Sequence, residues 1–599
     1  MKRLLLAVLL LASPAFAAVD PATLKGVDLL PGGVLSLKVG NDASLGTATA
    51  VTADASTGSG QALRLETLKE AANPWDVQAS AKIAAAVSKD DVCLASFWIR
   101  TQGSRLESGE AETQFVFELA KDPWEKSAEY PVRAGKEWRQ IFVPFQAKAS
   151  YPTGGAQMIF RMGYRPQAFE VAGMQVRDFG SQVKLGDLPV TKLSYQGREA
   201  DAPWRKEAQA RIEALRMAPL SIKVVDAQGR PVPGALVNVH QVRSAFYFGS
   251  ALSGHYLFRE KQAAGKTRYE AELKRLFNIT VEENAFKWPS LAGDWGSEMG
   301  MSLALESANW AKENGLAFRA HNLYWPSWRN SPKGLRSYEK DPEGLRRELL
   351  EHVRATVTTA KGLVTYWDVV NEPFDNHELS DILGAKSLGE AFREAHLADP
   401  AAKLYINDYA ILAGGGGDTP HRQHYRQVIE GLLRGGAPLQ GIGLQGHFGW
   451  NLTGMDDAKA ILDQYAALLP HLSITEYDIS VDDLDLAGDY TRDLLTLFFS
   501  HPAAEAFLMW GFWDGAHWGG NAPLFKKDWT PKPALQVWED LVLKQWRTNA
   551  NGMTSQDGAY NLRAFKGDYE VIVSLAGKRT GFKLQLLKPE GKTVDVTLK

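Results

Sequence analysis

Two glutamates in this 599-residue chain have surroundings that suit paired carboxylate chemistry. Glu372 follows an apolar, strand-like run over 364–371, and Glu476 lies inside a second such run over 472–479. Two carboxyl groups can cleave a glycosidic bond when one protonates the leaving oxygen and the other faces the anomeric carbon, about 5–5.5 Å away in retaining enzymes. A lone glutamate at a strand end is usually a structural ion-pair partner, so the interpretation depends on both residues converging.

The elements that would position them alternate between strand and helix over 244–546. Helical patterns occupy 302–314, 343–360, 421–433, 456–469, 489–499 and 535–546, and the strand-like runs are 246–252, 276–284, 317–325, 364–371, 403–409, 441–447, 472–479 and 506–513. This rhythm predicts a (β/α)8 TIM barrel, in which active sites form at the carboxyl ends of the strands. The alternative, an open doubly wound sheet, would want a Gly-rich phosphate-binding turn after its first strand, and the sequence has none there.

The remaining chain predicts a multidomain protein with β domains on both sides of the barrel. Residues 18–185 show six or more short strands and no long helical pattern, which indicates a jelly-roll-like β-sandwich. Residues 186–243 read as a linker helix and a β-hairpin, and 547–599 as a small C-terminal β domain. The sandwich is either structural or a carbohydrate-binding module. Its candidate sugar-stacking aromatics are Trp75, Trp98, Trp124, Trp138 and Tyr164.

The N-terminus and the net charge indicate where the protein acts and which partners it lacks. Residues 1–17 read as a signal peptide, with Lys2 and Arg3 before a short apolar run and Ala15-Phe16-Ala17 as the cleavage site, so we expect a secreted or periplasmic protein. No other apolar stretch is long enough for a membrane anchor. The formal net charge of −3 indicates no nucleic-acid partner. Cys93, the single cysteine, permits no internal disulfide.

The barrel region resembles glycoside hydrolase family 10, the family dominated by endo-β-1,4-xylanases. The resemblance covers about residues 245–545 and follows the family's motif order. The motifs are Phe248-Gly249-Ser250-Ala251, Glu283-Asn284 with Lys287-Trp288, Arg319-Ala320-His321, Trp367-Asp368-Val369-Val370-Asn371-Glu372, Tyr405-Ile406-Asn407-Asp408-Tyr409, Gly443-Leu444-Gln445-Gly446-His447, Ile474-Thr475-Glu476-Tyr477-Asp478 and Trp510-Gly511. The sandwich is similar, more distantly, to carbohydrate-binding modules of polysaccharide hydrolases.

The resemblance implies a role for each site residue. It makes Glu372 the acid/base and Glu476 the nucleophile of a retaining endo-xylanase. Gln445 and His447 should position Glu476, Asp408 should orient His447, and Trp510 and Trp518 should wall the cleft. The residues expected to hold the sugar in the −1 subsite are Glu283, Asn284, Lys287, His321, Trp325 and Asn371. The expected partner is xylan, with no cofactor, no metal and a monomeric enzyme.

Two other functions stay open at this point. The chain could act on another β-linked glycan or glycoside, or it could bind glycans without cleaving them. Pro326, Tyr477 and His517 depart from the family's usual residues near the expected cleft, so preferred chain length and endo or exo action stay open. Retention of both Glu372 and Glu476 argues against a silent binding protein.

Overall fold

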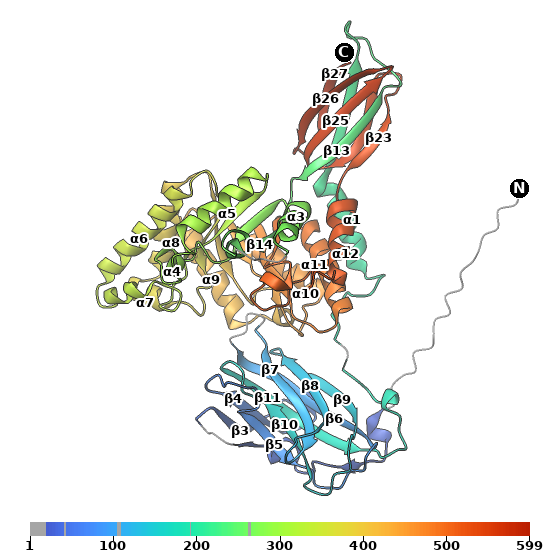
Figure 1. Ribbon diagram of the computed structural model, residues 1–599, viewed down its shortest axis with the longest axis vertical. Coiled ribbons are helices and arrows are strands. Elements are labelled where there is room, and N and C mark those ends of the chain that lie inside the picture. Colours follow the sequence, from blue (N-terminus) through green and yellow to red (C-terminus); the bar gives the residue numbers. More distant parts are fainter. Residues whose placement is uncertain (1–19, 41–43, 105–108, 192, 261–264, 599) are drawn as a thin grey trace, which may run out of the picture. The chain divides into compact units, whose positions relative to one another are not determined.

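The computed structural model describes residues 20–40, 44–104, 109–191, 193–260 and 265–598 and divides into two compact units, 1–193 and 194–599. Figure 1 traces both along the chain. The expected signal peptide over 1–17 lies outside the described residues. Within the described ranges, no helix combines the length and the apolar character needed to cross a membrane.

The first unit is a sandwich of two antiparallel sheets, in the region where the sequence predicts strands. One sheet has the order β3(Gly46–Thr52), β4(Gln61–Thr67), β11(Gln167–Asp178), β6(Val92–Ser104), β9(Arg139–Gln146), with β1(Val27–Asp28) against β11. The other has the order β2(Lys38–Gly40), β5(Gln78–Lys82), β10(Ala156–Arg161), β7(Ala111–Leu119), β8(Lys126–Ala134). Alternate residues of β6, among them Cys93 and Phe97, enter the shared core, where Phe97 packs edge-on against Phe160.

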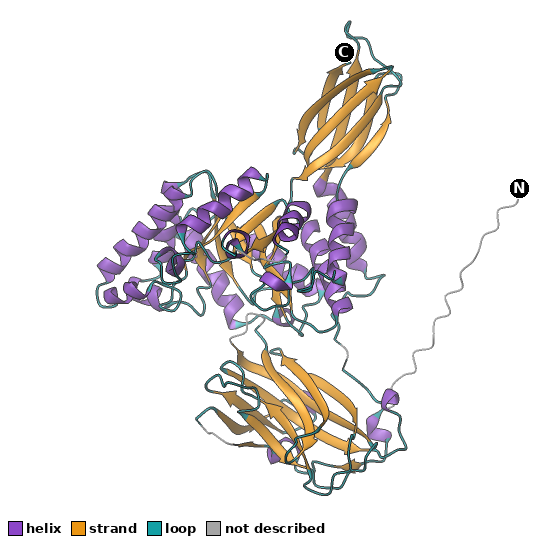
Figure 2. Ribbon diagram, viewed as in Figure 1, coloured by secondary structure: helices purple, strands orange, loops and turns teal. Residues whose placement is uncertain are grey.

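The second unit contains a closed barrel of eight parallel strands surrounded by helices, as predicted (Figure 2). The strands are β14(Tyr247–Leu252), β15(Ile279–Glu282), β16(Ala317–Tyr324), β17(Tyr366–Asn371), β18(Lys403–Asp408), β19(Gly441–Leu444), β21(Leu472–Ile479) and β22(Ala504–Met509), with the short β20(His447–Phe448) beside β21. β14 pairs with both β15 and β22, which closes the ring.

The helices pack against the outside of the barrel because the apolar residues of each helix recur on one side. In α6(Pro342–Thr359), Leu345, Leu349, Val353 and Val357 are buried at a spacing of four residues. The other long barrel helices are α3(Lys266–Leu276), α5(Met301–Glu313), α8(Lys386–Ala398), α9(Pro420–Arg434), α10(Met455–Leu468) and α11(Leu484–Ser500), and the short α12(Pro533–Trp538) follows β22. This ring leaves the carboxyl strand ends free for a site.

The C-terminal β domain differs from the prediction because it is built from two separate chain segments. The expected linker hairpin is β12(Met217–Val225) and β13(Leu236–Ser244), after α1(Pro203–Arg216). β12 pairs with β24(Ala559–Phe565) and β27(Lys592–Thr597), and β13 pairs with β23(Asn549–Met553) and β25(Gly567–Leu575), next to β26(Lys578–Leu586). The hairpin is therefore part of this domain rather than a connector, since its apolar face shares a core with the C-terminal strands.

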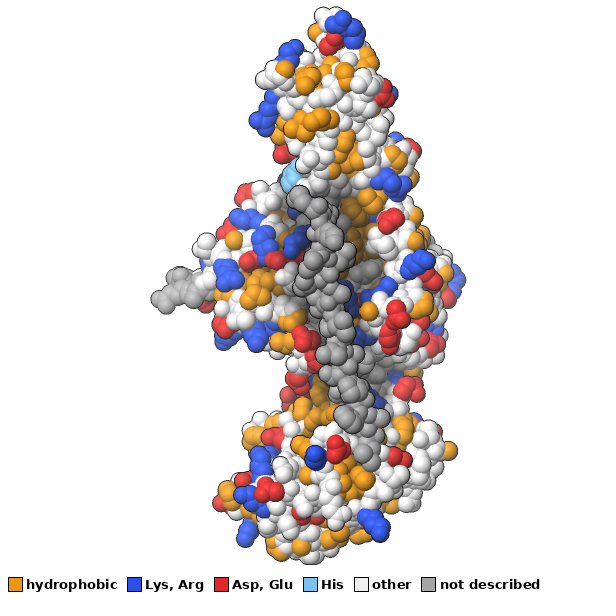
Figure 3. Space-filling view, turned by 90° about the vertical axis from the view of Figure 1, so that its right-hand side faces the viewer, with side chains coloured by type: hydrophobic (Ala, Val, Ile, Leu, Met, Phe, Trp, Pro, Cys, Tyr) orange, Lys and Arg blue, Asp and Glu red, His pale blue; other side chains and the backbone are white. Residues whose placement is uncertain are grey.

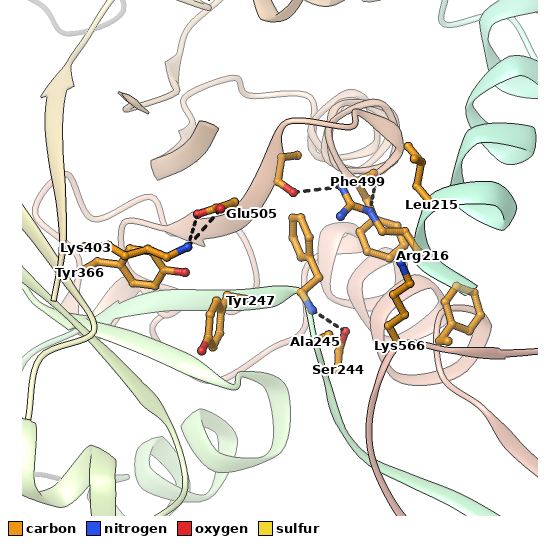
Figure 4. Close-up of a pocket in the computed structure, with 13 residues that line it drawn as sticks. Leu215, Arg216, Ser244, Ala245, Tyr247, Tyr366, Lys403, Phe499, Glu505 and Lys566 are labelled. Carbon is orange, nitrogen blue, oxygen red and sulfur yellow. Dashed lines mark hydrogen bonds and ion pairs between the residues drawn. The ribbon is translucent and has the colours of Figure 1, made fainter. Parts of the chain in front are cut away.

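This β domain meets the barrel at the amino ends of the strands. A cavity of about 280 Å³ lies there, lined by residues of both parts (Figure 4). Arg216 closes one side: its guanidinium donates to the backbone oxygens of Phe499, His501 and Ala504 and lies 5.0 Å from the Phe246 ring centroid. In this fold residues at the amino end support stability, whereas catalysis belongs to the opposite end.

Surface charge is mixed. On the face that Figure 3 shows, Lys and Arg side chains alternate with Asp and Glu side chains rather than gathering by sign.

Candidate active site

The carboxyl ends of the barrel strands bring the two glutamates into one buried polar cluster. Glu372 directly follows β17 and is 7% exposed, and Glu476 lies in β21 and is 4% exposed. The backbone of Glu372 is left-handed, with φ of 51°. A left-handed non-glycine residue costs about 1–3 kcal/mol and is often found at functional sites.

Two amides bind the carboxyl group of Glu372. Gln445 donates through Nε2 to Oε1 at 2.9 Å, and Asn376 donates through Nδ2 to Oε2 at 3.3 Å. From the sequence, Gln445 was expected to position Glu476 instead. The side chain of Gln445 contacts Glu372, and only its backbone oxygen accepts the N–H of Glu476, at 2.8 Å. Each oxygen of Glu372 therefore accepts from a neutral side chain.

The carboxyl group of Glu476 has its own donors. Asn407 donates through Nδ2 to Oε1 at 2.7 Å, and Nε2 of His447 lies 3.3 Å from Oε2. Nδ1 of His321 lies 3.9 Å from Oε1. His447, which the sequence predicts to position Glu476, thus lies beside it. The carboxyl group of Glu476 is therefore surrounded by polar side chains from three different strands.

Asn407 links the two glutamates and was not selected from the sequence. Its backbone oxygen accepts the N–H of Glu372 at 2.9 Å, while its side chain binds Glu476. Thr475 donates to Oδ1 of Asn407 at 2.7 Å, which fixes the amide so that Nδ2 faces Glu476 and Oδ1 of Asn371. The alternation of side chains along a strand could have pointed to Asn407. Neighbouring residues of a strand face opposite sides of the sheet, so either Asn407 or Asp408 had to face the barrel interior.

Asn371 presents a free donor in the same place. Its Oδ1 accepts from Asn407 at 3.0 Å, and its Nδ2 is buried without a hydrogen-bond partner among the described residues. A buried amide N–H without a partner costs free energy, so such a group points to a ligand. A sugar hydroxyl is an acceptor of the right kind.

Asp408 does not orient His447, so this expectation was wrong. Asp408 faces away from the barrel interior, where its Oδ1 accepts from Nε2 of His421 at 2.9 Å. Burial raises the pKa of Asp408. The residue beside His447 is Asp478, whose Oδ1 lies 2.9 Å from Nδ1.

The carboxyl group of Asp478 also contacts two residues of the loop after β22. Trp518 donates through Nε1 to Oδ2 at 2.8 Å, and Nε2 of His517 lies 3.5 Å from the same oxygen. Burial acts to raise the pKa of Asp478, but His447 and His517 outweigh it and hold the pKa below its ordinary value. One carboxylate therefore joins the imidazole next to Glu476 to the Trp518 loop.

Trp510 and Trp518 lie beside the two histidines, as expected of cleft walls. The ring centroid of Trp510 is 5.1 Å from that of His321, and the ring centroid of Trp518 is 5.6 Å from that of His447. Trp518 is 45% exposed, so it can meet a substrate. Tyr477, in contrast, is buried against α11 with its hydroxyl 2.7 Å from Oγ1 of Thr491, so it does not border the cleft.

The second-strand residues form a neighbouring group. Lys287 donates to Oδ1 of Asn284 at 2.9 Å and lies 5.5 Å from the centroid of the Trp325 ring. The indole N–H of Trp325 is buried without a partner among the described residues, and Glu283 is half-buried. Trp325 is 6.2 Å from His321 by ring centroids, so this group adjoins the Glu476 cluster.

The imidazole of His321 is held by Asp368. Its Nδ1 lies 3.0 Å from Oδ2 of Asp368, and Nε of Arg319 donates to the same oxygen at 3.1 Å. Burial acts to raise the pKa of Asp368, but Arg319 and His321 outweigh it and lower the pKa. Asp368 therefore remains ionised and fixes the imidazole orientation.

In the sandwich, the candidate sugar-stacking aromatic residues differ in how far they are exposed. Trp75 and Trp124 are 52% and 45% exposed. Trp98 and Trp138 are partly buried against a small apolar cluster. Burial raises the pKa of Tyr164 to about 12.

The barrel region is similar to known proteins. Residues 238–541 match the model of glycosyl hydrolase family 10. The chain is 30% identical over 395 residues to the anti-sigma-I factor RsgI6 of Acetivibrio thermocellus, covering 65% of this chain and 49% of that protein. It is 31% identical over 336 residues to endo-1,4-beta-xylanase 3 of Hypocrea jecorina, covering 54% and 90%. It is 25% identical over 375 residues to endo-1,4-beta-xylanase 1 of Arabidopsis thaliana, covering 62% and 38%.

The chain thus spans about half or less of two of these three relatives. Among solved structures, xylanase 10B of Thermotoga petrophila in complex with xylobiose is 26% identical, with a TM-score of 0.45 over 50% of this chain and 95% of that one. The family model covers the whole barrel and half of the chain. The chain belongs to glycosyl hydrolase family 10.

Proposed function

We propose that this chain is a retaining endo-β-1,4-xylanase that cleaves internal bonds of xylan by double displacement. The observation that carries the proposal is that Asn407 contacts both Glu372 and Glu476, so the two carboxyl groups belong to one cluster at the barrel mouth. The matching xylanases favour xylan as the substrate.

In the first step, Glu476 attacks the anomeric carbon while Glu372 donates its proton to the leaving oxygen. The glycosidic bond breaks and a covalent glycosyl-enzyme forms. In the second step, Glu372 takes a proton from water, whose oxygen attacks the same carbon and releases Glu476. Asn407 and His447 contact the carboxyl group of Glu476, and the free Nδ2 of Asn371 is available to a sugar hydroxyl.

Product stereochemistry tests the mechanism. Proton NMR of the first products from xylohexaose should show the β-anomer before mutarotation, because two inversions retain configuration. An initial α-anomer would exclude double displacement. Assays on arabinoxylan, glucuronoxylan, β-glucan and an aryl xyloside, run side by side, test the substrate: hydrolysis of β-glucan alone would exclude xylan.

We also propose export. The support is the sequence pattern at Ala15-Phe16-Ala17, and mass spectrometry of the protein secreted by its native host should give an N-terminus at Ala18. A mass that retains residues 1–17 would contradict it.

We further propose that the sandwich binds the polysaccharide. Arg161 at the end of β10 faces away from the sandwich core, is 6% exposed, and has its Nε buried without a partner among the described residues. The exposed Trp75 ring lies 5.5 Å from its guanidinium carbon. An aromatic face beside a free donor suits a neutral sugar ring. In full-length E476Q, W75A should weaken retention by xylan in affinity electrophoresis several-fold, and W124A serves as the comparison. Unchanged retention in W75A would contradict this site.

A further inference from the structure

Glu372 is held by a residue that has no assigned function, Asn376. The backbone N–H of Asn376 donates to the backbone oxygen of Glu372 at 3.2 Å. Its side-chain Nδ2 contacts the same backbone oxygen at 3.2 Å and Oε2 of the Glu372 carboxyl at 3.3 Å. Asn376 is therefore tied to both the main chain and the reacting group of Glu372.

The other end of the Asn376 amide is fixed by the loop after β16. Asn330 donates through Nδ2 to Oδ1 of Asn376 at 2.9 Å and to Oγ of the buried Ser327 at 3.0 Å. Because Oδ1 of Asn376 accepts this bond, its Nδ2 must face Glu372. The hydrogen-bond network thus decides the orientation of the amide.

Two hydrogen bonds join the loop after β16 to the start of the short helix α7(Glu378–Leu383), which follows β17. The N–H of Leu379 donates to the oxygen of Pro326 at 3.1 Å, and the N–H of Trp328 donates to Oε2 of Glu378 at 3.3 Å. Pro326 is one of the positions where this chain departs from the family's usual residue. The hydrogen bonds from Asn330 to Ser327 and to Asn376 therefore lie where these two segments of the chain are held together.

We propose that Asn376 is a positioning residue for proton transfer by Glu372, with Asn330 as its anchor. Gln445 holds Oε1 and Asn376 holds Oε2, so the two amides together set the plane of the carboxyl group. The oxygen lone pairs that these amides leave unused are the ones that can exchange a proton with the glycosidic oxygen and then with water. This inference rests on the proposed assignment of Glu372 as acid/base.

The test compares substrates whose leaving groups differ in their need for an acid. Cleavage of xylotetraose requires protonation of the leaving sugar, whereas 2,4-dinitrophenyl β-xylobioside releases a phenolate that needs none. In N376A, kcat/KM for xylotetraose should fall about tenfold or more, because misplaced catalytic groups lose about 10²-fold and general acids contribute about 10²–10⁴. The kcat/KM for the dinitrophenyl substrate, which reports only the first step, should stay within about twofold.

Two further variants calibrate the result. N330A should give the same split with a smaller loss, because it removes the anchor and keeps the Asn376 amide; it also stands in for N376A if that variant fails to fold. S380A is the matched control, since Ser380 lies in helix α7, four residues after Asn376, and its hydroxyl donates to the backbone oxygen of His377. It should leave both substrates unchanged.

The outcomes separate this inference from the proposed function. Equal losses on both substrates in N376A and N330A would show a structural effect and overturn the inference. E372A is the reference: without a leaving-group split in E372A, the acid/base assignment itself fails. A split in E372A but not in N376A or N330A overturns only the positioning of Glu372 by Asn376. Adding N376A to E372A should bring no further loss on the dinitrophenyl substrate, because the two act through one group.

Discussion

The side-chain amide of Asn407 donates to Oε1 of Glu476 at 2.7 Å while the backbone oxygen of the same residue accepts the N–H of Glu372. This contact places strand β18 between the two carboxyl groups of the site. Residues of that strand therefore have sharply different effects depending on which side of the barrel wall they face.

Replacing Asn407 by alanine removes a donor from Glu476 and keeps the backbone contact to Glu372. A hydrogen bond to a charged group is worth about 1.5–3 kcal/mol, so we expect kcat/KM to fall about ten- to hundredfold. The loss should be similar for xylotetraose and for the dinitrophenyl substrate, because nucleophilic attack is common to both. N314A, at the end of α5, is the control for amide removal far from the site. A loss confined to xylotetraose would contradict this assignment.

Replacing two aspartates, one at a time, tests which of them orients His447. D408N should change kcat/KM by less than about threefold, because Asp408 contacts His421 outside the barrel interior. D478N should lower kcat/KM about tenfold or more, because it removes the negative charge beside His447 and weakens the acceptor of the Trp518 indole N–H. Steady-state kinetics on xylotetraose measures both, and the reverse order would restore Asp408 as the partner of His447.

The buried Glu282 predicts a pH dependence of stability. Burial raises its pKa from 4.5 to about 7, against the N–H donors of Ala285 and Asn284, which act to lower it. Between these pH values the folded chain holds a proton that the unfolded chain has lost, so unfolding releases it. The free energy of unfolding should therefore fall as the pH rises from about 4.5 to about 7.

In E282Q that part of the pH dependence should disappear. Urea unfolding at several pH values across the window measures it, and E207Q, at an exposed position of α1, is the control. A slope equal to that of the unsubstituted protein would show that Glu282 ionises alike in both states.

Truncation after Trp546 tests the two-segment C-terminal domain. The shortened chain keeps β12 and β13 but loses all their partner strands, which exposes Leu220, Ile222 and Val237. We expect insoluble protein or a marked fall in melting temperature, because unpaired apolar strands aggregate. Soluble yield and thermal unfolding measure this. A truncated barrel that melts like the full chain would mean that the β domain is separable.

The sequence by itself determined the local features of this protein. The strand-and-helix rhythm over 244–546 predicted the barrel. Glu372, just after one strand-like run, and Glu476, inside another, were predicted to meet at its mouth. These features are readable because each depends on residues close together in the chain, through hydrophobic periodicity and the direction of parallel strands.

Only the tertiary structure decided the partners. It shows that Asn407 rather than Asp408 faces the site, that Gln445 binds Glu372, and that Asn330 orients Asn376. It also shows that β12 and β13 each join a different sheet, with strands more than 300 residues further along the chain. Strand facing depends on register, and amide orientation depends on partners from other loops, so neither follows from local pattern.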